Sequence, residues 1–206
     1  MSDTIQMHAI KQKISGLDPK QQAILASAFE AFRCYGFKRT SMEDIAKGAG
    51  MSRAALYLHY RNKEDIFQSL AQGYYDMAAE AVAQVLAQDL PLPELLHQAF
   101  QAHAGAIYEA LISSPHGQEL LDTKHTHSME VVAEGDSRLA GIYADWLQAG
   151  ADAGKITLQD LGGSPEDVAK TLYDALHGVK TSLQEPEAFR ASIHRLAVLF
   201  GRALTP

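Results

Sequence analysis

The chain has 206 residues, a formal net charge of −7 and a single cysteine, Cys34. The acidic balance argues against a protein that coats nucleic acid, and one cysteine cannot form an internal disulfide framework. No run approaches the roughly 18 uninterrupted apolar residues that a membrane-spanning helix needs, and the first residues lack the apolar core of a signal peptide. We therefore expect a soluble, cytoplasmic protein that does not associate with membranes.

The charge is divided unevenly along the chain. Residues 1–70 contain ten Lys/Arg and seven Asp/Glu, whereas residues 71–206 contain eight and eighteen. A basic N-terminal part on an acidic remainder is typical of a protein that docks on a polyanion through one end.

The hydrophobic pattern predicts helices throughout, without a convincing strand of period two, so we expect an all-α fold. Asp18 and Pro19 are suited to begin a first helix, and Gly36 to end it. Residues 41–60, SMEDIAKGAGMSRAALYLHY, then predict two short helices joined by a tight turn at Gly50. This pattern is typical of the helix-turn-helix, which places its second helix in the major groove of DNA, although helices joined by a glycine turn occur in many other helical proteins.

Capping residues mark where the helices of this segment begin. Ser41 can cap the second helix, with Asp44 completing a capping box, and Ser52 can cap the third. Ala46 is small, as a close crossing of two helices requires, and Leu56 is placed to bury against it. The local pattern therefore supports a compact pair of helices.

Residues 56–67, LYLHYRNKEDIF, resemble the signature of the TetR family of transcriptional repressors, in which a Tyr-x-His-aromatic segment ends the recognition helix and Asn-Lys-Glu opens a long fourth helix. Residues 28–46, AFEAFRCYGFKRTSMEDIA, are also similar to that family, and the resemblance covers about residues 18–74. It implies an N-terminal three-helix DNA-binding module with the helix-turn-helix at 18–68. A C-terminal helical ligand-binding and dimerisation domain would occupy 69–206.

Eight residues are predicted to face double-stranded DNA: Thr40, Ser41, Ser52, Arg53, Ala54, Tyr57, His59 and Lys63. Arg53 is the candidate for base readout because its planar guanidinium matches guanine, and a phosphate contact is the alternative. Ala54 could touch a thymine methyl group. The acidic pair Glu43 and Asp44 departs from the basic face expected on the second helix.

The other predicted contacts are to the DNA backbone. Thr40 and Ser41 are expected to bind phosphate together with the N–H groups that begin the second helix. The resemblance implies that Tyr57, His59 and Lys63 grip the backbone, and Lys63 would gain from the positive end of the fourth helix.

Downstream, the sequence predicts a long helix that begins at Asn62 and is stopped by Pro91 and Pro93. Further helices are expected at about 96–111, 118–121 and 129–153, and two more follow the Gly162–Pro165 break and Pro186.

The last two helices carry apolar seams that could form a dimer interface: Val168, Leu172, Val179 and Leu183 on one, and Ile193, Leu196 and Phe200 on the other. One interpretation is that both seams only close the core of their own subunit. The resemblance implies instead a four-helix bundle with a second copy. Because a palindrome is read by two recognition helices, we expect a homodimer.

Five of the nine histidines lie between His97 and His127, which makes a zinc or nickel sensor conceivable. The absence of cysteine partners and the wide angle between His97 and His103 around a helix argue against it, so no metal and no cofactor are predicted. The resemblance implies a cavity for an unknown small organic effector, lined by Phe100, His103, Ile107, Tyr108, Tyr143 and Trp146. Plain core packing is the alternative for each of these residues.

The sequence contains no Gly-x-Ser-x-Gly, His-Glu-x-x-His or phosphate-loop motif, so no enzyme is predicted. The expected function is a one-component transcription regulator, a repressor that binds a palindromic operator as a dimer and is released by a small molecule. An activator would differ only in operator position. The first 17 residues fit either a frayed tail or a short amphipathic arm whose Lys11 and Lys13 reach phosphate.

Overall fold

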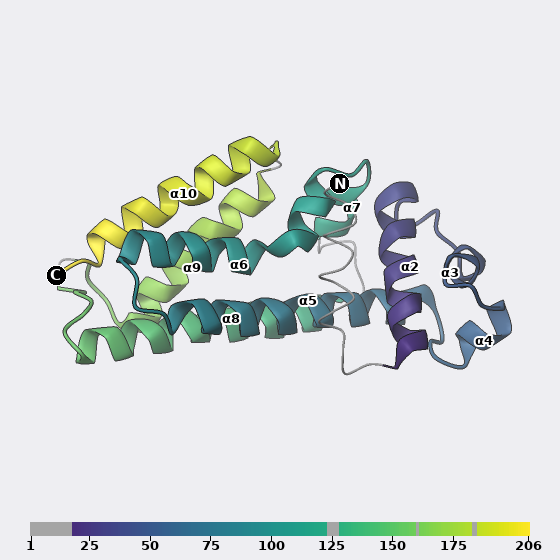
Figure 1. Cartoon of the computed structure of the whole chain (residues 1–206), viewed down its shortest axis with the longest axis horizontal. Helices are drawn as coiled ribbons and strands as arrows, with labels where there is room; N and C mark the ends of the chain where they lie inside the picture. The colour runs from purple at the N-terminus through teal and green to yellow at the C-terminus, as the bar shows by residue number, and fades with distance from the viewer. Residues whose placement is uncertain (1–17, 123–127, 160, 183–184) are drawn as a thin grey trace. The chain divides into compact units, whose positions relative to one another are not determined.

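The computed structural model describes residues 18–206 except 123–127, 160 and 183–184 (Figure 1). The described residues form helices joined by turns and contain no strand, which confirms the predicted all-α fold. The helices are α2 (Pro19–Tyr35), α3 (Met42–Gly48), α4 (Arg53–Tyr57), α5 (Lys63–Leu86), α6 (Leu92–Ile112), α7 (Gly117–Leu121), α8 (Met129–Asp152), α9 (Pro165–Thr181) and α10 (Pro186–Ala203). The predicted roles of Lys11 and Lys13 lie outside the described residues.

The starts of the first helices follow the predicted capping residues. Asp18 Oδ1 accepts hydrogen bonds from the N–H groups of Lys20 and Gln21, at 2.7 and 3.2 Å. Ser41 caps α3 in a reciprocal capping box with Asp44, and Ser52 Oγ accepts from the N–H of Ala55 at 3.1 Å. These bonds satisfy backbone donors that a helix start otherwise leaves without partners, so each helix begins where its cap stands.

Packing divides the chain into two compact units. The first consists of the described residues of Met1–Tyr74 together with Ala106–Ala133, and the second of Tyr75–Gly105 with Glu134–Pro206. Helices α5, α6 and α8 each contribute residues to both units. The functional boundary between 18–68 and 69–206 is a separate matter and stays a prediction.

The core of the first unit is built from one apolar stripe of each helix of the helix-turn-helix module. Its most buried members are Ile24 and Phe32 of α2, Ile45 of α3, Leu56 of α4 and Ile66 of α5. Leu56 is the residue through which the five-residue helix α4 is anchored in this core, as its spacing from Ala46 predicted. The opposite face of α4 is left exposed to solvent.

The second unit packs α6, α8, α9 and α10 around buried Phe100, Leu139, Leu172 and Ile193. The predicted end of helix α5 was wrong. Pro91 and Pro93 do not end α5, which stops at Leu86; Pro93 lies in the first turn of α6. Proline is tolerated there because the first turn of a helix needs no N–H donor.

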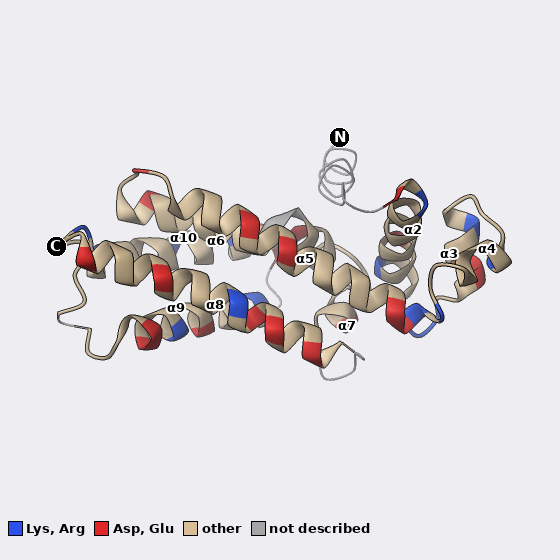
Figure 2. Cartoon of the chain, turned by 90° about the horizontal axis from the view of Figure 1, so that it is seen from below, with Lys and Arg blue, Asp and Glu red and all other residues tan. Residues whose placement is uncertain are grey.

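The charges follow the uneven division seen in the sequence (Figure 2). Lys and Arg occur on α2, α3 and α4, while Asp and Glu recur along α5 and α8. None of the helices formed by the described residues is both long and apolar enough to cross a bilayer.

Candidate nucleic-acid interface

The outward face of α4 consists of side chains that make few contacts within the protein. Arg53, Ala54 and Tyr57 are exposed, and Leu58, directly after the helix, is 85% exposed. Leu58 adds exposed apolar surface at the tip of this face. The sequence interpretation missed Leu58, although its place between Tyr57 and His59 marks it as a tip residue.

Arg53 and Tyr57 act as a pair along this face. An Nη2 hydrogen of Arg53 is donated to the Tyr57 hydroxyl at 3.3 Å, and the guanidinium carbon lies 5.5 Å from the centre of the Tyr57 ring. The hydrogen bond raises the pKa of Arg53 above its ordinary value, so the side chain stays charged. One turn of helix separates the two residues, which is the spacing at which side chains meet.

Ser41 is fully engaged with Asp44 at the start of α3. The Ser41 hydroxyl donates to Asp44 Oδ2 at 2.6 Å, and the Ser41 N–H donates to the same oxygen at 2.9 Å. These bonds lower the pKa of Asp44, so a carboxylate already stands at the positive end of α3. Phosphate binding by Ser41 stays a prediction, and a phosphate would have to compete with this carboxylate.

The phosphate contact predicted for the Thr40 side chain is wrong. Thr40 is only 2% exposed, and its single hydroxyl hydrogen is shared between the carbonyl oxygens of Gly36, 2.8 Å from Oγ1, and Ala31, 3.2 Å from it. The chain turns back at Gly36, whose φ of +84° suits glycine, and this turn carries Thr40 under the end of α2. Its hydroxyl therefore satisfies carbonyls at the end of a helix.

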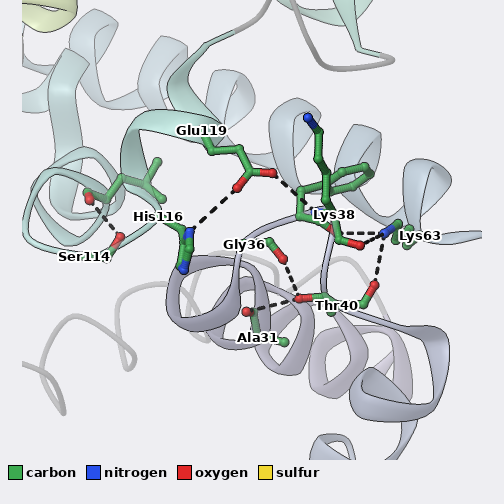
Figure 3. Close-up of polar contacts among 10 residues, drawn as sticks. Ala31, Gly36, Lys38, Thr40, Lys63, Ser114, His116 and Glu119 are labelled. Carbon is green, nitrogen blue, oxygen red and sulfur yellow. Dashed lines mark hydrogen bonds and ion pairs between the residues drawn. The ribbon is translucent and has the colours of Figure 1, made fainter.

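The Lys63 ammonium binds backbone carbonyls within the protein, and its phosphate contact stays a prediction. Its Nζ donates to the carbonyl oxygens of Phe37 at 2.7 Å, Thr40 at 3.0 Å and Lys38 at 3.2 Å (Figure 3). The same nitrogen lies 4.7 Å from the centre of the Phe37 ring. An ammonium group has three N–H donors, and these three acceptors account for them.

His59 stands between the end of α4 and the start of α2. Its Nδ1 lies 4.0 Å from Asp18 Oδ2, and its side chain is about one-fifth exposed. This position ties the residue after α4 to the cap of α2, and contact of His59 with the DNA backbone stays a prediction.

Helix α7 also contacts the turn between α2 and α3, the turn that Lys63 binds. Glu119 Oε1 accepts from the backbone N–H of Lys38 at 3.3 Å, and Glu119 Oε2 lies 3.7 Å from His116 Nδ1 (Figure 3). Both residues lie against Gly36, where an added Cβ would come within 2.6 Å of Glu119 Oε2. The sequence interpretation located α7 but gave no signal for this contact, because the partners are about 80 residues apart.

The six residues predicted to line an effector cavity do not all come together. In the second unit, His103 lies 6.1 Å from Tyr143 and 5.3 Å from Tyr173 between ring centres, and Phe100 lies 6.3 Å from Tyr143. Trp146 is half-buried on the same helix as Tyr143. These residues form an aromatic cluster that includes Tyr173, which was not predicted.

Ile107 and Tyr108 belong to the first unit, and their place in a cavity lining stays a prediction. Ile107 packs against the core of the helix-turn-helix module, and burial raises the pKa of Tyr108 to about 12. The periodicity of α6 identified one buried stripe but could not show that its two ends serve different cores.

A polar junction in the second unit also escaped the sequence interpretation. Asp136 Oδ1 accepts hydrogen bonds from the hydroxyls of Tyr75 at 2.7 Å and Tyr173 at 2.5 Å. It therefore joins α5, α8 and α9 beside the aromatic cluster. The sequence could have indicated Asp136, because this acidic residue lies at helical spacing from Leu139 and Tyr143 and so on the buried stripe of α8.

Burial makes His103 a neutral residue. Desolvation lowers its pKa well below the ordinary value, and the charges of Lys180 and His177 add to the effect. Among the described residues, no three His, Cys, Asp or Glu side chains are grouped so as to hold a metal ion. His125 and His127 lie outside the described residues.

The predicted dimer seam needs correction. Val168, Leu172 and Ile193 are buried inside the second unit of a single chain, so they cannot meet a second copy. The exposed large apolar residue of α10 is Leu199, at 65%, with Leu196 and Phe200 half-buried nearby. Val179 is also half-buried, and Leu183 lies outside the described residues.

Comparison with known proteins agrees with this geometry. Residues 24–70 match the model of bacterial regulatory proteins of the TetR family. The chain is 32% identical over 116 residues to the regulator EthR of Mycolicibacterium smegmatis, covering 50% of this chain and 52% of EthR. It is 31% identical over 114 residues to the repressor BepR of Brucella suis, covering 55% and 53%. The chain thus spans about half the length of the curated relatives that it matches.

Solved structures share the fold over most of the chain. FadR of Bacillus subtilis in complex with stearoyl-CoA has a TM-score of 0.69 at 19% identity, covering 88% of this chain and 97% of that one. The SmeT–triclosan complex has a TM-score of 0.68 at 18% identity, covering 91% and 92%. The match over residues 24–70 assigns the helix-turn-helix module to the TetR family of bacterial regulatory proteins, and the solved structures show that the all-helical fold is shared over most of the chain.

Proposed function

We propose that the protein is a repressor that binds a palindromic operator as a homodimer and releases it when a small organic molecule binds in the second unit. The observation that carries this proposal is the exposed face of α4, where Arg53, Tyr57 and Leu58 project from a helix anchored in the core by Leu56. The name of its relative BepR, a repressor, supports the direction of regulation.

Dimerisation follows from the size of the reading element. Helix α4 has five residues, so one copy reads few base pairs, and two copies read half-sites whose centres are about 34–36 Å apart. On α10, the exposed edge carries Ser192, Leu196, Leu199 and Ala203 at heptad spacing. Along α9 and its C-cap residue, Thr171, Ala175, Gly178 and Ser182 repeat at the same spacing. Small residues facing leucines would let two copies of this helix pair approach closely.

The aromatic cluster of the second unit supports an organic effector. Phe100, His103, Tyr143 and Tyr173 offer flat apolar surfaces, and a neutral His103 adds a hydrogen-bonding group that carries no charge. Similar folds are known in complex with triclosan and with stearoyl-CoA, and each of these molecules carries an apolar part, the chlorinated rings of one and the acyl chain of the other. The effector of this protein would belong to the same broad chemical class.

Release would act through α5, which begins at Lys63 in the first unit and carries Tyr75 in the second. A ligand that disturbs the bond from Tyr75 to Asp136 would shift α5 and change the separation of the two recognition helices. A change of a few ångströms is enough to prevent both helices from docking on one face of DNA.

The test is a competition experiment on the DNA sequence that the protein selects from a random pool. Long-chain acyl-CoA thioesters and chlorinated phenols serve as probes, and the DNA dissociation constant is measured with and without each. We expect at least one probe class to weaken the complex, and less so in a Tyr75→Phe variant that binds DNA normally without a probe. Unchanged affinity with every probe would contradict the effector part of the proposal.

A further inference from the structure

We propose that Lys63 is a positioning residue for DNA recognition: from the start of α5 its ammonium group holds the α2–α3 turn, and with it the start of α3, rather than binding a DNA phosphate. The inference rests on DNA binding by the helix-turn-helix module and not on repression, dimerisation or an effector.

The contacts of Lys63 converge on one short segment. The three carbonyl oxygens that accept from its Nζ belong to Phe37, Lys38 and Thr40, so they lie within four consecutive residues (Figure 3). The ring of Phe37 covers the same nitrogen. A compact ammonium with three rotating donors suits such a cage, whereas a planar guanidinium does not.

The aromatic neighbours keep the cage in place. The Phe37 ring lies 5.2 Å from the Phe32 ring of α2 and 5.4 Å from the Phe67 ring of α5, between ring centres. The turn is therefore packed against both helices, and the Lys63 stem enters it from α5. Aromatic pairs at these distances add stability beyond the area that they bury.

The held segment determines where α3 begins. Thr40 immediately precedes Ser41, the N-cap of α3, and Thr40 itself donates to Gly36 and Ala31 at the end of α2. Thr40 thus ties α3 to α2 through its hydroxyl and to α5 through its carbonyl. Because α4 packs on α3, a looser start of α3 would loosen the exposed face that carries Arg53.

A phosphate contact would require Lys63 to give up these bonds. The bonds from the ammonium to the carbonyls of Phe37 and Thr40 are partly buried and that to Lys38 is exposed, so breaking them costs free energy and leaves two partly buried carbonyls without their charged partner. Lys38 offers a comparison in the same turn, because its side chain is exposed while its backbone forms part of the cage. Loss of charge can therefore be separated from loss of the cage.

The experiment measures operator affinity as a function of salt for wild type, Lys63→Arg, Lys63→Ala and the charge-matched control Lys38→Ala. We expect Lys63→Arg to keep its charge and yet lose about tenfold or more in affinity, with an unchanged slope of log K against log salt. Thermal melting should fall by a few degrees in both Lys63 variants and stay near wild type in Lys38→Ala.

The opposite pattern would overturn the proposal. A phosphate contact predicts that Lys63→Arg binds as tightly as wild type, and that Lys63→Ala lowers the salt slope by about 2 for the two copies of a dimer. A wild-type protein that binds no DNA would contradict the function itself, and this result is distinguishable from a failure of the Lys63 role.

Two further measurements keep the proposal testable if Lys63→Ala does not fold. The ammonium ¹⁵N signal of Lys63, assigned by its loss in Lys63→Arg, should be protected from exchange in the free protein and keep its position when DNA binds. A large shift on DNA addition would contradict the cage. Thr40→Val should also weaken binding, and the double variant with Lys63→Arg should lose less than the two single losses combined, because both side chains hold one turn. Strict additivity would count against a shared role.

Discussion

The polar side chains of the DNA-binding module differ in the partners that they bind within the protein. Thr40 and Lys63 donate to backbone carbonyls of the α2–α3 turn, and Ser41 is engaged with Asp44. Arg53 is exposed, and its guanidinium donates to the hydroxyl of Tyr57, which is also exposed. Arg53 therefore stays the candidate for base readout.

Replacing Arg53 with Ala should cost about 1–3 kcal/mol per half-site on the preferred operator and leave non-specific binding nearly unchanged. The control is Tyr57→Phe, which removes the hydroxyl that Arg53 contacts but keeps the charge. Binding is measured on the preferred and on scrambled duplexes. Equal weakening on every sequence would make Arg53 a phosphate contact.

Gly36 is a second residue whose role can be tested alone. Its φ of 84° and ψ of 155° fall in a region essentially restricted to glycine, so Gly36→Ala should lower the free energy of unfolding by about 1–3 kcal/mol. Gly73, inside α5 with nothing within 4 Å of an added Cβ, is the matched control. Gly73→Ala should stabilise by about 0.5–1 kcal/mol. Two changes of the same sign in denaturant unfolding would contradict this account.

At the scale of helices, the sequence indicated where elements begin better than what they pack against. The caps at Asp18, Ser41 and Ser52 depend on neighbours within a few residues, so local reasoning could locate them. The heptad seams of α9 and α10 identified buried residues, but a periodic pattern does not say whether the covering surface belongs to the same subunit. Val168 and Ile193 were assigned to the wrong surface for that reason.

The exposed edge of α10 gives a prediction about assembly. Leu199→Glu should convert the dimer to monomers that remain folded, because it places a charge in the proposed interface without touching the core. Leu58→Glu, the same change at the exposed tip of the other unit, should leave the dimer intact. Sedimentation gives the mass, and helical content confirms folding. A Leu199→Glu dimer as stable as wild type would place the interface elsewhere.

Burial of His103 in the second unit should make the free energy of unfolding depend on pH. Because burial holds its pKa well below that of the unfolded chain, the unfolded chain takes up the proton first as pH falls. The free energy of unfolding should therefore decrease below about pH 6.5, by up to about 1.4 kcal/mol per pH unit. His103→Gln should reduce this slope, whereas His116→Gln, at a partly exposed site of the first unit, is the control. Equal slopes in wild type and His103→Gln would contradict the assignment.

For the whole molecule, the fold class and the reading helix could be predicted from sequence, whereas contacts between distant segments could not. The approach of Glu119 to Lys38 and the shared Asp136 oxygen each join residues far apart in the chain. No local spacing encodes such pairs. The same holds for the effector residues, where a single stripe on α6 proved to serve two separate cores.

The most direct test of the central claim is selection of bound DNA from a random pool with wild type and Arg53→Ala in parallel. A dimeric reader with one α4 per half-site should enrich an inverted repeat whose half-site centres lie about one helical turn, or a multiple of it, apart. Arg53→Ala should keep the spacing and lose preference at one base pair in each half. Enrichment of no sequence by the wild type, or of a single unrepeated site, would contradict the account.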